Sequence, residues 1–240
     1  MYNALSFFYK GELQARYFKQ QLPNYGVFDE KRYFQSGNER CVVPFKGYHL
    51  GLLICEDIWI NEPIDALKQA GADLVLSINA SPYSREKPHI RTQLIKEHCQ
   101  RTQLPVVYLN QIGGQDELVF DGCSKVFDER GNVTHRLAAF EEQIAIAEVD
   151  EKHIIPMENP AIELTPLAQV YQALVLATRD YVTKNGFKGA ILGLSGGIDS
   201  GLTVAIAADA LGKESAHAVM MPFRYTSEMS IHDAKEQADL

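Results

Sequence analysis

The chain has 240 residues, 46% hydrophobic and 22% charged, which is an ordinary composition for a globular protein of one large domain or two smaller ones. Its formal net charge of −8 argues against a nucleic-acid partner, because such partners require clustered lysine and arginine. No apolar run approaches the ~20 residues that cross a bilayer, so we expect no membrane partner.

The first predicted elements are short strands arranged as hairpins. Residues 2–9 and 13–18 flank a Lys-Gly-Glu turn and predict one β-hairpin. Because the chain opens on what resembles an interior hairpin, we expect the N-terminal part of this domain to be missing. Residues 41–45 and 48–54 predict a second hairpin, and its second strand ends at Cys55.

The pattern changes after Cys55 to an alternation of helices and strands. In order, it predicts a helix at residues 63–70, a strand at 73–78, a helix at 87–103 and a strand at 104–109. This order is typical of a layered α/β domain. Further short strands are predicted at residues 118–120, 124–127, 133–137 and 143–149.

A second domain follows a linker. Residues 150–164 contain two prolines and scattered charges without periodicity, which is typical of a linker. Thr165 and Pro166 predict the N-cap and first position of a helix that runs to about Lys184. The remaining predictions are strands at residues 189–194 and 216–221 and helices at residues 203–211 and from residue 233. One βαβ unit cannot cover both faces of a parallel sheet, so we expect the C-terminal part of this domain to be missing as well.

The four cysteines are widely spaced and form no C-x-x-C pair. This spacing fits neither a zinc site nor a disulfide framework, and the N-terminus lacks the features of a signal peptide. Free thiols in a reducing cytoplasm are the simplest interpretation. The cysteines are Cys41, Cys55, Cys99 and Cys123.

Cys55 follows the apolar run at residues 51–54, which predicts a buried strand. Reactive groups in α/β folds often lie at the carboxyl ends of such strands. A free cysteine is more commonly a small core hydrophobe. Cys55 taken alone fits both interpretations.

A glycine-rich stretch at residues 193–200 lies between a predicted strand and a predicted helix. In that setting backbone N–H groups and the helix N-terminus bind anions, and two glycines let the backbone approach a phosphate. Asp199 is suited to hold a magnesium ion on that phosphate. The stretch lacks the Gly-Lys-Ser/Thr ending of a Walker A loop. The alternative is a strand–helix turn whose hydroxyls only cap the helix.

Gly-Leu-Ser-Gly-Gly-Ile-Asp-Ser resembles the pyrophosphate loop of ATP pyrophosphatases and is most similar to the version in NAD synthetases. Met-Pro-Phe-Arg-Tyr-Thr-Ser at residues 221–227 is similar to a stretch of the same enzymes, although alone it would pass for a surface loop. The resemblance implies that ATP and Mg²⁺ are bound, with Asp199 on the metal ion. The implied ATP-binding residues are Gly193, Leu194, Ser195, Gly196, Gly197, Ile198, Asp199 and Ser200.

In the first domain, Lys-x-x-Leu-Pro-Asn-Tyr from Lys19 and Ile-Cys-Glu-Asp-Ile-Trp around Cys55 resemble the nitrilase superfamily, specifically the glutaminase domain of glutamine-dependent NAD synthetases. In such chemistry a thiolate attacks an amide while a nearby ammonium lowers the thiol pKa and stabilises the oxyanion. The resemblance makes Cys55 the nucleophile and Lys19 its ammonium partner. A lysine before a proline turn would otherwise be an ordinary solvated residue.

By the same resemblance, Tyr25, Ser81 and Lys87 hold the substrate glutamine, and Glu30 matches a secondary glutamate of nitrilases. Ser81 alone is equally an ordinary turn residue before a proline, and some family members carry arginine in place of Lys87. A cation suits the substrate carboxylate in both cases, although lysine lacks the bidentate fork of arginine.

The chain departs from the family pattern at the base glutamate, for which it has no match. A glutaminase uses this residue to shuttle protons to the leaving ammonia. The family supplies it upstream of the lysine, and nothing there matches. Glu12 lies in the first predicted hairpin and is no substitute. Glu56 and Asp57 adjoin the nucleophile, but consecutive side chains on an extended run point to opposite faces.

The resemblances together imply an α/β chain in two parts. We expect a nitrilase-like α-β-β-α sandwich at residues 1–150, a linker at residues 151–164, and the start of a Rossmann-like ATP-pyrophosphatase domain at residues 165–240. The implied reaction releases ammonia from glutamine through a cysteine thioester and uses ATP to adenylate and amidate deamido-NAD to NAD. The implied partners are these small molecules, and the complete protein is expected to form homo-oligomers.

Three alternatives remain open. The first is a stand-alone nitrilase-type amidase, and the second is a different ATP-pyrophosphatase amidotransferase. The third is an inactive truncated chain that lacks the base glutamate. Because that base has no match, we expect weak or absent glutaminase turnover from these 240 residues.

Overall fold

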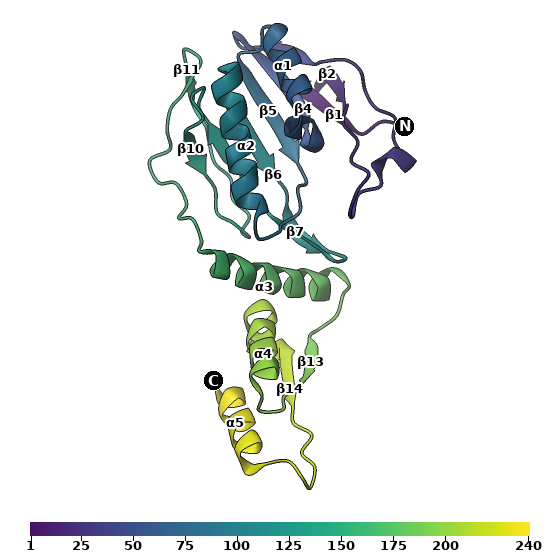
Figure 1. Cartoon of the computed structure of the whole chain (residues 1–240), viewed down its shortest axis with the longest axis vertical. Helices are drawn as coiled ribbons and strands as arrows, with labels where there is room; N and C mark the ends of the chain where they lie inside the picture. Colours follow the sequence, from purple (N-terminus) through teal and green to yellow (C-terminus); the bar gives the residue numbers. More distant parts are fainter. The chain divides into compact units, whose positions relative to one another are not determined.

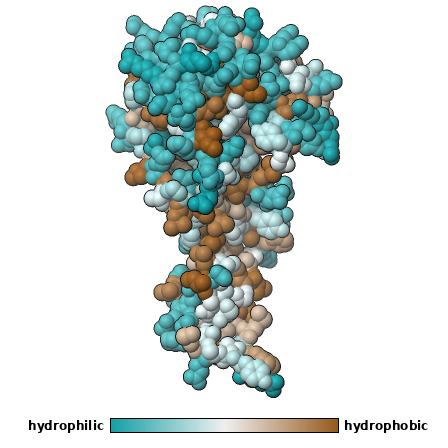
Figure 2. Space-filling view, in the orientation of Figure 1, coloured by the Kyte–Doolittle hydropathy of each residue, from teal (hydrophilic) through white to brown (hydrophobic).

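The computed structural model describes all residues 1–240 and divides into two compact units. The first comprises Met1–Ile112 and Phe120–Glu163, and the second comprises Gly113–Val119 and Leu164–Leu240. Figure 2 shows a mostly hydrophilic surface over the first unit and several apolar residues over the second. No helix of the chain has the length and apolar character needed to cross a membrane.

The first unit is built on a six-stranded mixed sheet. Its strand order is β10-β9-β6-β5-β4-β3, in which β4, β5 and β6 are parallel and β3, β9 and β10 pair antiparallel to their neighbours. The parallel strands are nearly continuous apolar runs, as expected for strands buried on a sheet face. The strands are β3 (Val42–Phe45), β4 (Tyr48–Ile54), β5 (Leu74–Asn79), β6 (Val106–Asn110), β9 (Lys125–Phe127) and β10 (Val133–Arg136).

Helices α1 (Asn61–Gln69) and α2 (Lys87–Thr102) cross over between the parallel strands and cover one face of this sheet (Figure 1). Between them and the sheet lies the main core, which includes Leu52, Ile64, Val75 and Ile95. Gly51 permits α1 to approach β4 closely, because a Cβ there would lie 2.8 Å from a methyl carbon of Leu67. The helix–strand alternation predicted after Cys55 is therefore confirmed.

The predicted opening hairpin is also confirmed as β1 (Ala4–Tyr9) paired with β2 (Glu12–Phe18). Lys10 and Gly11 both have positive φ, at 51° and 82°, as a two-residue hairpin turn requires. A short 3₁₀ turn at Glu30–Arg32 follows. This part of the chain brings Lys19 directly after β2.

The short strands beyond Asn110 differ in detail from the prediction. We expected a strand at residues 143–149, but only Val149–Asp150 (β11) is one, and it pairs with His153–Ile154 (β12) inside the segment we expected to be a linker. Ile144 and Ile146 alternate with alanines in this stretch, and their side chains are 97% and 81% exposed. Residues 143–148 form no ladder with any strand. Sequence reasoning also missed β7 (Ile112–Gln115), which pairs with β8 (Leu118–Asp121).

The second unit contains the predicted βαβ arrangement. Strands β13 (Ala190–Gly193) and β14 (Ala216–Val219) are parallel, and α4 (Ile198–Leu211) connects them. Helix α3 (Pro166–Lys184) begins as predicted, because the Thr165 hydroxyl accepts a hydrogen bond from the Ala168 N–H. Helix α5 (Glu228–Asp239) starts earlier than the predicted residue 233. Its N-cap is Ser227, whose hydroxyl accepts a hydrogen bond from the Ser230 N–H.

Helix α4 begins five residues earlier than the predicted residue 203. We assigned the whole Gly-Gly-Ile-Asp-Ser stretch to a turn, but the structure begins the helix at Ile198, with Gly197 as its N-cap. The Ser200 hydroxyl bonds to the Gly197 carbonyl at 2.9 Å and stabilises this first turn. The glycine-rich motif is consequently divided between a strand end, a loop and a helix start.

Candidate active site

The candidate site of the first unit lies at the carboxyl edge of the three parallel strands. Cys55 follows β4, Ala80 and Ser81 follow β5, and Asn110 ends β6. Parallel strands end at a common edge, and α/β folds bind their ligands there. The strand order therefore brings together residues that are separated by up to 55 positions in the sequence.

Cys55 opens a five-residue 3₁₀ turn, η2 (Cys55–Trp59), immediately after the buried strand. Its φ of 47° is in the left-handed region, which is uncommon for a residue with a Cβ. Such strained backbone occurs where the surrounding structure fixes it, often at functional sites. The thiol is half-buried.

Two opposing influences act on the Cys55 thiol. Burial raises its pKa, whereas the Lys19 ammonium and a hydrogen bond from the Ala80 backbone N–H lower it. The carboxylates of Glu56 and Glu30 oppose ionisation more weakly. Burial outweighs the ammonium, so the pKa of the thiol is raised overall, while the direction in which Lys19 acts agrees with the nucleophile–ammonium hypothesis.

Lys19 is 1% exposed, and its ammonium pairs with the Glu30 carboxylate at 2.6 Å. A buried lysine needs such a partner, because an isolated ammonium in the interior is costly. The solvated alternative for Lys19 is therefore excluded. Glu30, which the sequence matched only to a secondary glutamate, also accepts a bond from the Asn3 amide at 3.4 Å.

Two further side chains of η2, those of Glu56 and Trp59, contact residues expected to bind glutamine. The Tyr25 hydroxyl donates to the Glu56 carboxylate at 2.9 Å, and burial followed by this contact raises the pKa of Tyr25 to about 12. The Lys87 ammonium lies 4.0 Å from the centre of the Trp59 ring, within cation–π range. One short turn thereby gathers Cys55, Tyr25 and Lys87.

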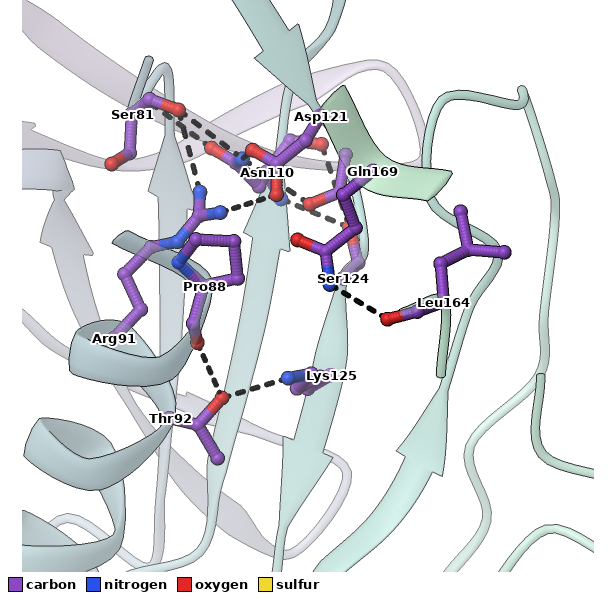
Figure 3. A network of polar contacts seen from close by, with 11 residues as sticks. Ser81, Pro88, Arg91, Thr92, Asn110, Asp121, Ser124, Lys125, Leu164 and Gln169 are labelled. Atoms are coloured by element: carbon purple, nitrogen blue, oxygen red, sulfur yellow. Dashed lines mark hydrogen bonds and ion pairs between the residues drawn. The ribbon is translucent and has the colours of Figure 1, made fainter. Parts of the chain in front are cut away.

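Ser81 is held from both sides by a buried polar network (Figure 3). Its N–H donates to the Asn110 side-chain oxygen at 3.0 Å, and its carbonyl accepts from the Arg91 guanidinium at 3.3 Å. Arg91 also forms an ion pair with Asp121, and both side chains are almost fully buried. Ser81 is 3% exposed and is therefore not an ordinary turn residue at the surface.

In the second unit, hydrogen bonds within the glycine-rich loop hold its backbone, and several of its N–H groups have no acceptor. The hydroxyls of Ser195 and Ser200 lie 3.0 Å apart and accept the N–H groups of Gly197 and Ser195. The N–H groups of Gly196, Ile198 and Asp199 have no acceptor within the chain. The serine side chains thus brace the loop, while its backbone donors remain available for an anion.

A cavity of about 230 Å³ adjoins this loop. Gly193 and Ser195 line it on one side, and the segment after β14, including Met221 and Thr226, lines it on the other. Gly196 has a φ of 81°, and a Cβ there would lie 2.2 Å from the Ser230 carbonyl, so only glycine fits. Asp199 is exposed in the first turn of α4, and no group of three or more metal-ligating side chains surrounds it.

Sequence reasoning missed four polar residues that shape the first site. Asp57 accepts hydrogen bonds from the segment after Lys19, and Arg91, Asn110 and Asp121 fix Ser81. Asn110 carried a usable signal, because a polar residue ends a strand of the predicted parallel sheet. Arg91 and Asp121 carried none, because charged residues are ordinarily exposed.

Comparison with family models finds two matches. Residues 1–158 match the carbon-nitrogen hydrolase model, and residues 170–240 match the NAD synthase model. Among curated relatives, the glutamine-dependent NAD(+) synthetase of Acinetobacter baylyi is 47% identical over 99% of this chain, and that of Aquifex aeolicus is 37% identical over 99%. This chain covers 44% and 48% of those two proteins, so it spans less than half the length of each.

Among solved structures, the chain is similar to glutamine-dependent NAD+ synthetase from Acinetobacter baumannii in complex with ADP. The TM-score is 0.96 and the identity 48%, over 99% of this chain and 45% of that chain. A carbon-nitrogen hydrolase from Helicobacter pylori has a TM-score of 0.56 at 22% identity, over 59% of this chain and 54% of that chain. This second likeness supports the nitrilase-like fold alone.

Proposed function

The chain belongs to the carbon-nitrogen hydrolase family, whose model matches residues 1–158, and we propose that it contributes to a glutamine-dependent NAD synthetase. Its first unit supplies the cysteine site that releases ammonia from glutamine. Its second unit, in which residues 170–240 match NAD synthase, supplies the loop that binds the phosphates of ATP. The alternatives of an unrelated amidase or amidotransferase have weaker support, because relatives of this name match both units together.

The proposed reaction at Cys55 is acyl transfer from an amide. The Cys55 thiolate attacks the side-chain carbonyl carbon of glutamine, and the Lys19 ammonium stabilises the oxyanion that forms. The C–N bond then breaks as the amide nitrogen takes up the proton that the Cys55 thiol released, which in this family a base glutamate shuttles, and ammonia leaves a thioester to Cys55. Water cleaves the thioester, which gives glutamate and the free thiol. Tyr25, Ser81 and Lys87 hold the substrate, with Lys87 opposite its α-carboxylate.

The observation that carries this proposal is the environment of one sulfur atom. Cys55 has a left-handed backbone conformation at the carboxyl edge of a parallel sheet, and a buried ammonium acts on its thiol. Cys123 shares the left-handed φ, at 50°, and has the buried Lys125 acting on its thiol, but it follows the hairpin strand β8 and does not lie at the carboxyl end of a parallel strand. Cys99, by contrast, is fully buried, and burial raises the pKa of its thiol to about 12.

The test is covalent labelling with a diazo-ketone analogue of glutamine, followed by intact-mass measurement and peptide mapping. We expect one adduct on Cys55, protection by free glutamine, and no adduct on a Cys55→Ser chain. Cys123, whose thiol is half-buried as well, is the internal control for nonspecific alkylation. A label on Cys123, or labelling that glutamine does not slow, contradicts a glutamine pocket at Cys55.

For the second unit, we propose that the N–H groups of Gly196, Ile198 and Asp199 bind the phosphates of ATP. The residues fit this group, because the donors are unpaired and lie next to a cavity at the N-terminus of a 14-residue helix. Asp199 would hold Mg²⁺ through one carboxylate, since magnesium commonly takes its other ligands from phosphates and water. ATP, when bound, supplies the adenylate that activates deamido-NAD toward ammonia.

The Asp199→Ala chain tests the magnesium assignment by titration with ATP, with and without Mg²⁺. We expect the benefit of Mg²⁺ for ATP affinity to disappear in the variant, while affinity without Mg²⁺ does not fall. An Asp199→Ala chain whose ATP affinity in Mg²⁺ equals that of the unchanged chain contradicts the assignment.

The remaining partners are proposed on the same family resemblance. They are glutamine, ATP and deamido-NAD, with assembly of the complete protein into homo-oligomers. Four free cysteines, none in a disulfide, support a reducing compartment, and we propose the cytoplasm. Sedimentation of the complete protein tests the assembly.

A further inference from the structure

The reaction proposed above leaves the buried carboxylate of Asp57 without a role. Asp57 is 0% exposed, although it is an acidic residue in the turn that carries Cys55. No lysine, arginine or histidine forms an ion pair with it. A buried carboxylate without a cation is costly unless hydrogen-bond donors surround it.

Four donors surround Asp57, two on each oxygen. Oδ1 accepts the backbone N–H groups of Gln20 and Gln21 at 3.0 and 2.7 Å. Oδ2 accepts the backbone N–H of Ile54 at 3.1 Å and the Tyr17 hydroxyl at 2.9 Å. Four donors on two oxygens is the full acceptor capacity of an ionised carboxylate.

The positions of these donors in the chain indicate what the Asp57 carboxylate does. Ile54 immediately precedes Cys55, and Gln20 immediately follows Lys19. One oxygen of Asp57 therefore fixes the peptide next to the nucleophile, and the other fixes the peptide next to the ammonium. Apart from Asp57, no hydrogen bond joins residues 19–21 to residues 54–59.

We propose that Asp57 is a positioning residue that sets the Lys19 ammonium against the Cys55 thiol by holding the backbone beside each of them. This inference rests on the proposed function, in which those two groups work together. Hydrogen bonds to an ionised acceptor are about twice as strong as neutral ones, which suits a group that must hold two segments in fixed register. Asp57 itself touches no substrate atom.

The proposal predicts that an amide cannot replace the Asp57 carboxylate. In an Asp57→Asn chain only one side-chain oxygen remains, and the NH₂ group faces two donors in place of accepting from them. If the oxygen keeps Gln20 and Gln21, the Ile54 N–H is left unpaired. If it keeps Ile54, the Lys19 segment is released. In both cases one catalytic group loses its anchor.

The experiment measures the rate of Cys55 alkylation by iodoacetamide as a function of pH, in the full chain, with peptide mapping to separate Cys55 from the other cysteines. This readout needs no glutaminase turnover. Lys19→Met serves as the benchmark, because it removes the ammonium that stabilises the thiolate. Tyr17→Phe is the matched control, because it removes one donor from Asp57 but leaves the three backbone bonds in place.

We expect Lys19→Met and Asp57→Asn each to raise the thiol pKa by roughly one unit and to slow alkylation at neutral pH by roughly tenfold. Tyr17→Phe should lower the thermal midpoint without moving the pH profile. If Lys19→Met moves the profile and Asp57→Asn does not, the positioning role is wrong while the proposed function stands. If Lys19→Met leaves the profile unchanged, the proposed pairing of Cys55 with Lys19 fails, and the role of Asp57 fails with it.

Hydrogen exchange of the unchanged chain decides the question should Asp57→Asn not fold. The amides of Gln20, Gln21 and Ile54 should be protected and should share one opening rate, because a single carboxylate holds all three. Exchange of Gln20 and Gln21 at the rate of free loop amides, with Ile54 still protected, overturns the proposal.

Discussion

At the residue scale, the site is organised by the turn that begins at Cys55. Each polar side chain of this turn faces a different segment: Glu56 bonds Tyr25, and Asp57 bonds the segment after Lys19. Trp59 lies under the Lys87 ammonium. A residue with φ of 47° costs free energy in isolation, and these contacts on consecutive residues hold the backbone there. The sequence Cys-Glu-Asp-Ile-Trp therefore organises the candidate site as well as carrying the proposed nucleophile.

The first prediction at this scale concerns Lys87. A Lys87→Met chain should require a roughly 10- to 100-fold higher concentration of the glutamine analogue for half-maximal labelling of Cys55, because a charge-assisted contact to the substrate carboxylate is lost. Alkylation by the uncharged reagent iodoacetamide should be unchanged. Mass spectrometry of the Cys55 peptide measures both.

Lys87→Arg is the control for this prediction, since it keeps the cation and its contact with the Trp59 ring. It should label at nearly the concentration of the unchanged chain. Equal losses in Lys87→Met and Lys87→Arg, or no loss in either, would show that Lys87 only packs on Trp59.

The residues of the site differ in how far sequence could reveal them. Cys55 and Lys19 could be proposed as site residues because the residues around them resemble a known family. Asp57 could not, because we treated residues 55–57 as extended chain, in which neighbouring side chains point apart. The 3₁₀ turn changes that geometry and directs the Asp57 carboxylate inward, which only the folded chain shows.

At the element scale, helix α2 supplies the support behind the site. Lys87, Arg91 and His98 lie at spacings of four and seven, which places them along one side of the helix. Lys87 faces the candidate substrate site, Arg91 holds the Ser81 loop, and His98 bonds to the Ile58 carbonyl of the Cys55 turn at 2.8 Å. A helix with a polar buried side is unusual in a core, and here each polar group is used to fix a loop.

The buried pair of Arg91 and Asp121 gives a prediction for stability. Asp121→Ala should lower the free energy of unfolding by about 3–5 kcal/mol, because it leaves the guanidinium buried and uncompensated. A double variant, Arg91→Met with Asp121→Leu, should recover much of that loss, since apolar groups of similar size replace both charges. Urea unfolding followed by circular dichroism measures the difference.

The double variant also separates stability from positioning. It loses the guanidinium and keeps only the Asn110 amide, at 3.4 Å, to hold the Ser81 carbonyl, so its Cys55 labelling by the glutamine analogue should stay weak even though the fold is restored. Labelling that returns in proportion to stability would mean that the pair supports the fold only.

His98 gives a prediction for the pH dependence of stability. Burial lowers its pKa; the bond to the Ile58 carbonyl opposes that shift, and the Arg101 guanidinium reinforces it. Its neutral form donates to Ile58 and accepts from Arg101 at 2.9 Å, so protonation removes the acceptor. The charged groups that face it are Glu97 and Arg101 on α2 and Asp65 on α1.

Because the folded-state pKa is the lower one, the unfolded chain binds the proton first as pH falls. The contribution of His98 is therefore fully present above the unfolded pKa of about 6.5 and is lost below it, with a slope of at most about 1.4 kcal/mol per pH unit. Urea midpoints between neutral and mildly acidic pH measure this. A His98→Gln chain, which keeps a donor and an acceptor, should lose that part of the slope, and an identical slope in both chains would refute the assignment.

At the scale of the whole molecule, the order of elements was predictable and several boundaries were not. The alternation of apolar runs and amphipathic helices after Cys55 specified the parallel strands, because burial on a sheet face leaves a clear pattern. The strand predicted at residues 143–149 was wrong over residues 143–148, where Ile144 and Ile146 alternate as in a strand but are exposed and form no ladder. Strand pairing depends on the assembled sheet, so local alternation of side chains does not predict it.

The division into two units leads to the last prediction. The Cys55 site uses only residues of the first unit, and the glycine-rich loop uses only residues of the second. Each has its own core, around Leu52 and Val75 in one and around Leu194 and Val204 in the other. Substitutions at sites that share no partners have additive effects on free energy. A substitution at one site should therefore leave the ligand affinity of the other site unaltered.

Two reciprocal variants of the full chain test this independence. Cys55→Ala should bind ATP in Mg²⁺ within about twofold of the unchanged chain, whereas Asp199→Ala should keep the pH profile of Cys55 alkylation, because neither change alters the core of the other unit. Titration calorimetry measures the first, and peptide mapping after alkylation measures the second. A loss of ATP binding in Cys55→Ala would show that the two sites are coupled before any ammonia is made, which independent construction from separate residues does not allow.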